Sequence, residues 1–369
     1  MDALPVLKPL EKNDYPGLNT LFDKAFGTSR SLDTWAWKYQ NNPHGTAIAT
    51  VALVEQTEGD KLSDSDSSSL EKPKNEPSNP IVGFYGLVPS KVILTGKDMI
   101  AYQETDLMVD PKYAQGGLFK RLGRETYSRL MDQGHPFTFG FPNTTSLPAG
   151  KRILGWKAIE QIPLWTMLLK PSALQKALTL PGVSHSVDIL MSLYNRTKLS
   201  SSWTGNIIES NEVDESFASA LNGLPDPSGI TFVRDLDYLI WRYQQCPEQT
   251  YTFFSARSAD HQIRAAAVLS LDGAGRANLA EFIYAPGNDA AGTALLKHIA
   301  AYARKAACTT LRAWALAGSK EACFLADRGF FNRNAMNYHV IRSFWEPEFN
   351  RILYDARRWR LSSGDSDCV

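Results

Sequence analysis

The sequence predicts an α/β protein with two related domains, each a mixed sheet covered by helices on both faces. Three observations favour this fold class. The chain has 369 residues, which at roughly 100–200 residues per domain suffices for two or three domains. Apolar strand-like runs alternate with amphipathic helical runs along the chain, and a segment of the first half recurs in the second half.

The recurring segment is the best evidence for two domains. Trp37-Lys-Tyr-Gln-Asn-Asn-Pro43 reappears as Trp241-Arg-Tyr-Gln-Gln-Cys-Pro247, in which four of the seven positions are identical. Each copy follows a strand-like run and a helical run at nearly the same offset, as expected for an internal repeat. We therefore expect related domains at 1–165 and 205–345, a helical connector at 166–204 and a C-terminal tail at 346–369.

Periodicity within the first half predicts the order of its elements. Leu118, Leu122, Thr126 and Leu130 recur every four residues on one helical face, and Gly134 beyond them is a typical stop signal. Short apolar runs predict the strands. In order, we expect a strand at 5–9, a helix at 15–26 and another after it, strands at 47–54, 81–87, 90–94 and 100–109, a helix at 117–132, a strand at 136–141, a helix around 146–154 and a strand at 158–169.

One segment of the first half has a different composition. Residues 56–80 contain six serines and three prolines but no aromatic residue. Such a segment cannot bury enough apolar surface to offset its ordering entropy, so we expect a disordered insertion between two strands.

Charge and cysteine content exclude several classes of function. The chain has 39 basic and 39 acidic residues, so no net field draws it to nucleic acid or an anionic membrane. Its four cysteines are scattered, without a CxxC pair or zinc-ligand spacing. The N-terminus lacks the features of a signal peptide, and no apolar run reaches membrane-spanning length. We expect a cytoplasmic protein with no metal, no nucleic-acid partner and no membrane insertion, and the sequence leaves the oligomeric state open.

The most informative motif for chemistry is a turn between a strand and a helix. The expected strand ends at Val109, Asp110-Pro111 turns the chain, and Gly116-Gly117 opens the helix. Glycines at a helix N-terminus allow backbone N–H groups to approach a ligand, and the helix dipole favours negative charge there. The turn therefore suits a pyrophosphate, with further phosphate contacts from Lys120, Arg121 and Arg124. A purely structural tight turn is the alternative.

These residues resemble those of a known family. Val109-Asp-Pro-Lys-Tyr-Ala-Gln-Gly-Gly-Leu-Phe119 resembles the acyl-CoA-binding motif of the GNAT N-acetyltransferase superfamily. Trp35-Ala-Trp-Lys-Tyr-Gln-Asn-Asn-Pro-His-Gly45 resembles a tandem-domain branch associated with bacterial polysaccharide biosynthesis and, more distantly, the enhanced-intracellular-survival acetyltransferases. The resemblance implies two tandem GNAT-like domains, each with a mixed, mostly antiparallel, twisted sheet, and acetyl-CoA as co-substrate without a metal.

The resemblance also implies roles for individual residues. The amides of Gln115, Gly116, Gly117, Leu118 and Phe119, with Lys120 beside them, would hold the CoA pyrophosphate. Leu107, Met108 and Val109 would line a splayed strand on which pantetheine pairs with the backbone, and an N–H near Met108 would polarise the thioester. Asn143 matches a position that contacts the pantetheine arm or the reacting centre. Ala114 and Lys151 depart from the family pattern.

The second half lacks a comparable turn. Residues 285–296 occupy the corresponding place, but only Gly292 faces the helix. We therefore expect a degenerate second domain that binds no CoA and serves as a scaffold or a substrate-binding surface.

Three carboxylates are candidates for the general base that amine acylation requires. Alternation along the strand predicts that Glu104 and Asp106 share one face, close to the thioester. Val369 provides a terminal carboxylate, and in the enhanced-intracellular-survival enzymes the chain terminus acts as the base. Solvated edge carboxylates and a frayed tail are the alternatives.

These observations predict an acyl-CoA-dependent N-acyltransferase that acts by direct attack. Its acceptor would be the primary amine of a small polar molecule such as an amino sugar. A protein or peptide N-acetyltransferase and a non-catalytic acyl-CoA-binding or scaffold protein are the alternatives.

Overall fold

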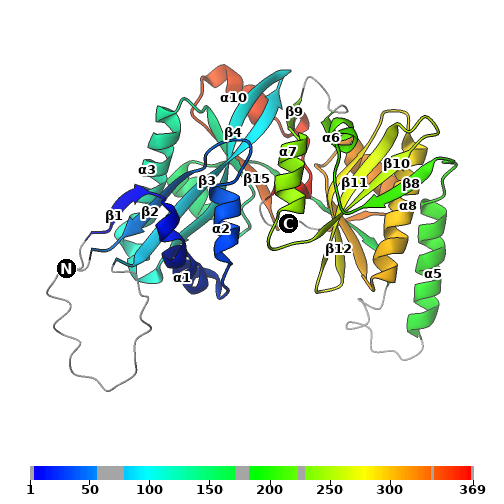
Figure 1. Cartoon of the computed structure of the whole chain (residues 1–369), viewed down its shortest axis with the longest axis horizontal. Helices are drawn as coiled ribbons and strands as arrows, with labels where there is room; N and C mark the ends of the chain where they lie inside the picture. The colour runs from blue at the N-terminus through cyan, green and yellow to red at the C-terminus, as the bar shows by residue number, and fades with distance from the viewer. Residues whose placement is uncertain (1–3, 56–78, 171–182, 223–228, 334–335, 367–369) are drawn as a thin grey trace.

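The computed structural model describes residues 4–55, 79–170, 183–222, 229–333 and 336–366. Its strands form two mixed sheets that lie side by side along the long axis of the molecule, with helices on both faces of each sheet (Figure 1). The predicted α/β class with two mixed, mostly antiparallel sheets is confirmed. All but the last two residues of the serine-rich segment 56–80 lie outside the described residues.

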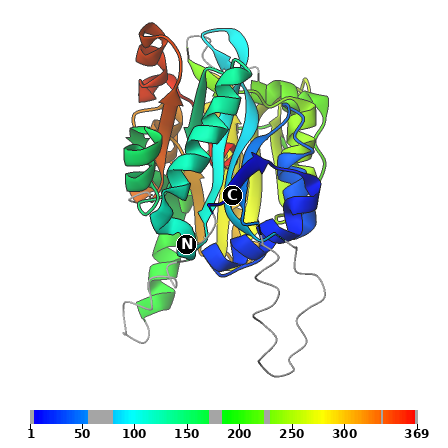
Figure 2. The same ribbon diagram turned by 90° about the vertical axis from the view of Figure 1, so that its left-hand side faces the viewer.

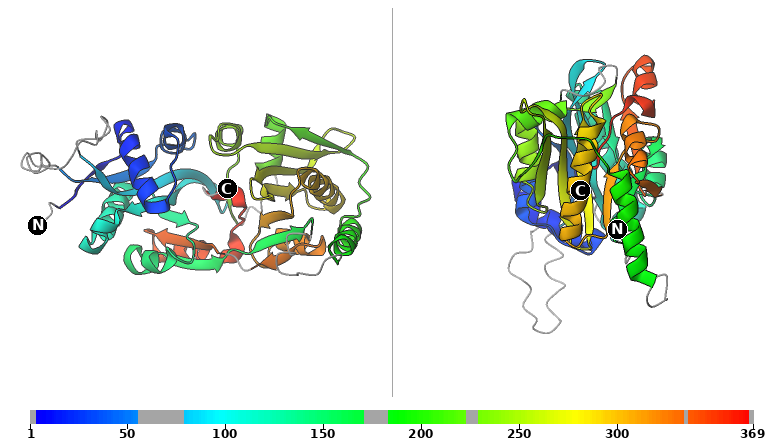
Figure 3. Two further views of the ribbon diagram at one scale, coloured as in Figure 1. Left: turned by 90° about the horizontal axis from the view of Figure 1, so that it is seen from below. Right: turned by 90° about the vertical axis from the view of Figure 1, so that its right-hand side faces the viewer.

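The first sheet has the strand order β1-β2-β3-β4-β5-β15-β6, and β9 pairs with β3 beyond the end of β2. Its strands are β1 (Val6–Pro9), β2 (Ile48–Leu53), β3 (Ile81–Leu94), β4 (Lys97–Val109), β5 (Phe137–Gly140), β15 (Tyr338–Ser343), β6 (Lys157–Gln161) and β9 (Ile230–Phe232). Figure 2 and the left panel of Figure 3 show α1 (Tyr15–Phe26) and α2 (Leu32–Tyr39) on one face and α3 (Leu118–Asp132) on the other. A short α4 (Leu147–Ala149) continues as a π-helical turn, Gly150–Leu154.

The second sheet has the order β14-β7-β13-β12-β11-β10-β8. Its strands are β14 (Phe331–Arg333), β7 (Leu164–Leu168), β13 (Thr310–Trp314), β12 (Arg276–Tyr284), β11 (Ile263–Asp272), β10 (Tyr251–Arg257) and β8 (Asn206–Ser210). The associated helices are α5 (Val183–Lys198), α6 (Glu215–Asn222), α7 (Leu236–Leu239) with the π-helical turn Ile240–Gln244, α8 (Asp289–Lys305) and α9 (Lys320–Asp327). After β15 come α10 (Pro347–Leu353) and short 3-10 turns at Ala356–Arg358 and Ser363–Asp365.

The two sheets exchange strands. The single strand expected at 158–169 is wrong, because Pro163, which lacks an N–H, separates β6 in the first sheet from β7 in the second. In return, β15 inserts between β5 and β6. The two sheets therefore do not coincide with the expected ranges 1–165 and 205–345. The strands expected at 81–87 and 90–94 are one strand, β3, in which Pro89 lies past the last β2 partner.

The repeated tryptophans meet between the two halves. The rings of Trp37 and Trp241 stack with centroids 4.8 Å apart. Trp37 Nε1 donates to the carbonyl of Trp241 at 2.7 Å, and Trp241 Nε1 donates to the carbonyl of Trp37 at 2.9 Å. Trp37 and Trp241 occupy the same position in the repeat and donate the same hydrogen bond to each other, so the two halves are related by near two-fold symmetry at this contact. His44 stacks on Tyr238 at 4.7 Å and extends this interface.

We expect Trp241→Ala to lower the free energy of unfolding by about 3–5 kcal/mol, because the buried ring, its stacking on Trp37 and its Nε1 hydrogen bond are all lost. Chemical denaturation measures this loss. Phe331→Ala, at a ring that is 43% exposed, is the matched control, with an expected effect of about 0.5 kcal/mol or less. A loss below about 1 kcal/mol for Trp241→Ala would show that the pair does not hold the halves together.

Candidate functional site

The site begins where β4 and β5 diverge. These parallel strands pair only at Tyr102–Thr138 and Gln103–Phe139, so β4 from Glu104 onward has no strand partner on that side. Backbone groups at such an opening are available to a ligand. The splayed strand that the sequence predicted is therefore present.

A cavity of about 470 Å³ lies at this opening. It reaches both faces of the sheet, because its walls come from α1 and the following loop, from β3 and β4, and from the start of α3 and the α4 region. The lining residues are Phe22, Phe26, Arg30, Tyr85, Glu104, Thr105, Asp106, Leu107, Phe119, Gly140, Phe141, Pro142, Asn143, Ser146, Ala149, Trp156 and Asn337. Glu104, Asp106, Leu107, Phe119 and Asn143 are thus brought together as the sequence analysis expected.

Glu104 lies in the cavity wall on the α3 side. Its carboxylate accepts hydrogen bonds from the hydroxyls of Tyr85 at 2.7 Å and Tyr127 at 2.8 Å, and from Thr138 Oγ1. Desolvation raises the pKa of Glu104 to about 7, although the three hydroxyl donors oppose the rise. A carboxylate with this pKa is matched to accepting a proton near neutral pH.

Asp106 does not share the face of Glu104. Two residues of β4, Asp106 and Leu107, stand opposite Tyr85 of β3, and Asp106 has a φ of 50°. This β-bulge shifts the alternation by one residue. The predicted common face is therefore wrong, because Asp106 points to the α1–α2 side.

The surroundings of Asp106 make it a poor base. Lys38 Nζ lies 2.7 Å and Arg30 2.9 Å from its two carboxylate oxygens, and Tyr39 donates to it at 2.7 Å. Desolvation alone would raise the pKa of Asp106, but Lys38 and Arg30 lower it to about 2. Asp106 thus stays ionised and anchors the helices, so its expected catalytic role has no support in this geometry.

The glycine turn has the geometry of an open anion site. Pro111–Gly116 forms a 3-10 turn, and Gly117 has a φ of 71° as the N-cap of α3. Because Gly117 has no side chain, it cannot accept hydrogen bonds from the first backbone amides of α3, those of Leu118 and Phe119. A Cβ added at Gly116 or Gly117 would meet no atom within 4 Å. The space beside these two glycines is therefore open.

The basic residues expected around the turn differ in their contacts. Lys120 and Arg124 are exposed, whereas Arg121 donates to the carbonyl of Pro5 at 2.8 Å and so braces β1. Gln115 is exposed on the turn.

The remaining predicted cofactor residues lie along the opening. Met108 is buried against Phe84, while Leu107 and Val109 pack on the α3 side. Asn143 Oδ1 accepts from the amides of Thr145 at 2.9 Å and Ser146 at 3.0 Å, which orders the start of α4. The position of Asn143 in the cavity wall agrees with the expectation, but its oxygen is used locally.

The corresponding place in the second half is occupied by the chain itself. Strands β12 and β13 also diverge, after the pair Leu279–Ala313. There Ser363 Oγ donates to the carbonyl of Leu279 at 2.7 Å, and Leu361 and Ser362 pack beside Phe282 and Trp314. Gly292, the single glycine of the corresponding turn, packs closely against Phe324 and Tyr284.

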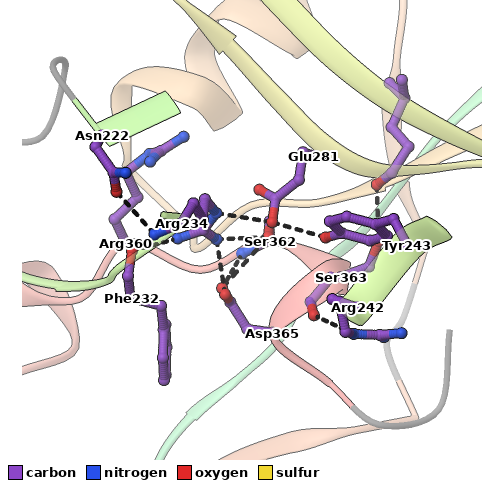
Figure 4. A network of polar contacts seen from close by, with 12 residues as sticks. Asn222, Phe232, Arg234, Arg242, Tyr243, Glu281, Arg360, Ser362, Ser363 and Asp365 are labelled. Atoms are coloured by element: carbon purple, nitrogen blue, oxygen red, sulfur yellow. Dashed lines mark hydrogen bonds and ion pairs between the residues drawn. The ribbon is translucent and has the colours of Figure 1, made fainter. Parts of the chain in front are cut away.

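The tail segment is held by a buried ionic network (Figure 4). Arg234 donates to Glu281 at 2.7 Å and to Asp365 at 2.7 Å, and both ion pairs are about 1% exposed. Arg242 donates to the carbonyl of Ser366 at 2.7 Å. Val369, the predicted terminal base, lies outside the described residues, so its role stays a prediction.

Sequence reasoning missed the groups that surround the two carboxylates. Tyr85, Tyr127 and Thr138 come from three different elements, and no local pattern joins them to Glu104. Lys38 and Tyr39 belong to the recurring tryptophan segment, so the repeat was a signal for their importance.

The described part of the chain has neither a metal-ligand cluster nor a membrane-spanning helix. There, no three or more His, Cys, Asp or Glu side chains are grouped to hold a metal ion. None of the helices in those ranges is long and apolar enough to span a bilayer.

The first half of the chain matches a known family profile, and the whole chain resembles several solved structures. The family profile for an acetyltransferase (GNAT) domain matches residues 6–159. No curated protein matches the chain. Three solved structures share its fold over 92% of its length. They are a probable N-acyltransferase of unknown function from Enterococcus faecalis (TM-score 0.65, 10% identity, 73% of that chain), a GCN5-related N-acetyltransferase from Anabaena variabilis (0.59, 10%, 72%) and an N-myristoyltransferase from Saccharomyces cerevisiae with bound myristoyl-CoA (0.58, 11%, 83%).

The family match covers the cavity residues of β3 and β4, the glycine turn and the α4 region. The structural matches span both sheets and share the fold at low identity. Residues 6–159 therefore match a GNAT acetyltransferase domain, and the whole chain shares the fold of these N-acyltransferase structures.

Proposed function

We propose that the protein transfers the acyl group of an acyl-CoA, with acetyl-CoA as the donor, to the primary amine of a small polar acceptor. The observation that carries this proposal is the cavity that joins the β4–β5 opening to Glu104. An amino sugar is one such acceptor, in keeping with the resemblance to the tandem-domain branch. The N-myristoyltransferase neighbour, solved with myristoyl-CoA, supports a thioester donor for this fold.

The proposed donor lies along the opening of the first sheet. The first amides of α3 and the exposed Lys120 would hold the pyrophosphate, and the unpaired edge of β4 at Leu107–Val109 would bind pantetheine. The acyl group would then enter the cavity beside Glu104. The open space in front of Gly116 and Gly117 supports this assignment.

The proposed reaction is direct aminolysis of the thioester. Glu104 accepts a proton from the acceptor ammonium, and the free amine attacks the thioester carbonyl carbon. A C–N bond forms, the C–S bond breaks, and the second amine proton accompanies the thiolate as the CoA thiol. Tyr85 and Tyr127, whose pKa values burial raises well above the ordinary value, stay neutral and orient Glu104.

A non-catalytic acyl-CoA-binding protein is the alternative. It would have no need of a carboxylate with a pKa near 7 at the thioester position. Steady-state release of CoA that depends on an added amine distinguishes an enzyme from a binding protein.

Gly116→Asp tests the donor site. The variant introduces a side chain and a like charge where the phosphates would bind, so acetyl-CoA affinity should fall at least tenfold, about 1.4 kcal/mol. Gly116 is preferable to Gly117, because Gly117→Asp adds strain at positive φ. Gly273→Asp, at another glycine with open space around it, is the matched control. Unchanged affinity by calorimetry in a folded Gly116→Asp protein would refute the assignment.

Glu104→Gln tests the base. We expect kcat to fall about 10²–10⁴-fold while acetyl-CoA affinity is retained. Because only the carboxylate form accepts a proton, wild-type activity should fall as the pH drops through about 7, the pKa of Glu104. This fall in activity at low pH should be absent from the pH profile of Glu104→Gln. Equal rates and an unchanged pH profile would exclude Glu104 as the base.

Titration with acetyl-CoA tests the degenerate second half. The tail occupies the opening between β12 and β13, so one molecule should bind per chain. Two equivalent sites would contradict this prediction.

A further inference from the structure

Each half contains an arginine in the same structural setting, but the groups that contact the two guanidinium groups differ. The backbone N–H of Arg30 donates to Asn19 Oδ1 at 2.8 Å, and that of Arg234 donates to Asn222 Oδ1 at 2.7 Å. Arg30 and Arg234 each lie seven residues before the tryptophan of their repeat. The two arginines are therefore structural equivalents.

Each arginine pairs with a carboxylate at a β-bulge. Arg30 binds Asp106 at 2.9 Å, and Arg234 binds Glu281 at 2.7 Å. The register of β12 shifts beside Glu281, as the register of β4 shifts beside Asp106. The tyrosine of each repeat also donates to this carboxylate, Tyr39 to Asp106 and Tyr243 to Glu281.

The difference lies in what the rest of each guanidinium contacts. Arg234 binds a second carboxylate, that of Asp365, at 2.7 Å, and both groups are buried. The second carboxylate beside Arg30, that of Glu248, lies farther away, at 3.4 Å, and is 46% exposed. Asp365 belongs to the tail segment that fills the opening of the second sheet. In the first half the same side of the sheet is open, and Arg30 lines the cavity there with a side chain that is 16% exposed.

We propose that Arg30 binds a carboxylate of the acceptor, as Arg234 binds that of Asp365. The acceptor is then a primary amine that also bears a carboxylate, as in an amino acid or an amino sugar acid. This proposal rests on the proposed function and narrows its acceptor class. In the second half, the Asp365 carboxylate of the tail occupies the position that the acceptor carboxylate would occupy beside Arg30 in the first half.

Charge in the cavity is consistent with such an acceptor. Glu104 provides the negative group for the ammonium, and Arg30 provides the positive group for the carboxylate. Asp106 is already neutralised by Lys38 at 2.7 Å. Glu248 approaches Arg30 Nε at 3.4 Å, but its side chain is 46% exposed, so solvent screens its competition. The rings of Phe22 and Phe26 complete this wall with apolar surface.

Paired acceptors test the proposal. Binding to the protein saturated with CoA is measured by calorimetry for phenylalanine against phenylalaninamide, and for galactosaminuronic acid against galactosamine. We expect at least one carboxylate form to bind tenfold or more tightly than its neutral partner, and the pair that shows the preference tells whether the amine is on an amino acid or a sugar. Arg30→Lys should reduce this preference at least tenfold. Arg129→Lys, at an arginine on α3 paired with Glu125, is the matched control.

The outcomes separate this inference from the proposed function. Equal binding within both pairs, or a preference that survives in Arg30→Lys, overturns the carboxylate assignment. A carboxylate preference that Arg30→Lys abolishes supports it, whether or not turnover is detected. Failure of acetyl-CoA itself to bind would instead refute the donor site.

Discussion

The divergence of β4 from β5 is the constraint on which the rest of the site depends. Two residue pairs hold these parallel strands together, and beyond them the sheet opens. The opening exposes the edge of β4, leads to the cavity and places the glycine turn at its outer end. A bulge at the same point turns Asp106 to the α1–α2 face and leaves Glu104 on the α3 face. One local irregularity thus separates a structural carboxylate from one that can carry a proton.

The near-symmetric relation between the halves allows their two openings to be compared, and the tail fills the second opening. Both halves diverge between corresponding strands and carry an arginine, a tyrosine and a carboxylate at a bulge. In the second half, the tail segment Leu361–Asp365 lies in the opening, where Asp365 pairs with Arg234 and Ser363 donates to the carbonyl of Leu279. A buried guanidinium that lost its carboxylate would be strongly destabilising, which explains why the tail is held so completely. The second sheet therefore supports the first through shared strands and the paired tryptophans.

Much of the site was accessible to sequence reasoning because it depends on local features. The helix of α3 follows from a four-residue apolar period, and the glycine turn from residues that permit positive φ. Glu104 was found because strand alternation placed a carboxylate near the turn. The same alternation failed for Asp106, since one extra residue at a bulge reverses every later assignment and leaves no compositional mark. Tyr127 and Thr138 were missed because they reach Glu104 from α3 and β5 only after folding.

The sequence by itself determined the α/β class, the internal repeat, the order of the elements in the first half and the glycine turn. These features are encoded in periodicity, turn residues and a recurring motif, all of which act over short distances along the chain. Tertiary structure decided that β7 and β15 exchange sheets, that the tail fills the second opening, and that Arg30 faces a cavity while Arg234 faces Asp365. Those outcomes depend on contacts between segments more than a hundred residues apart, such as Arg234 and Asp365, and on which edge is free when the sheets assemble. No local pattern carries that information.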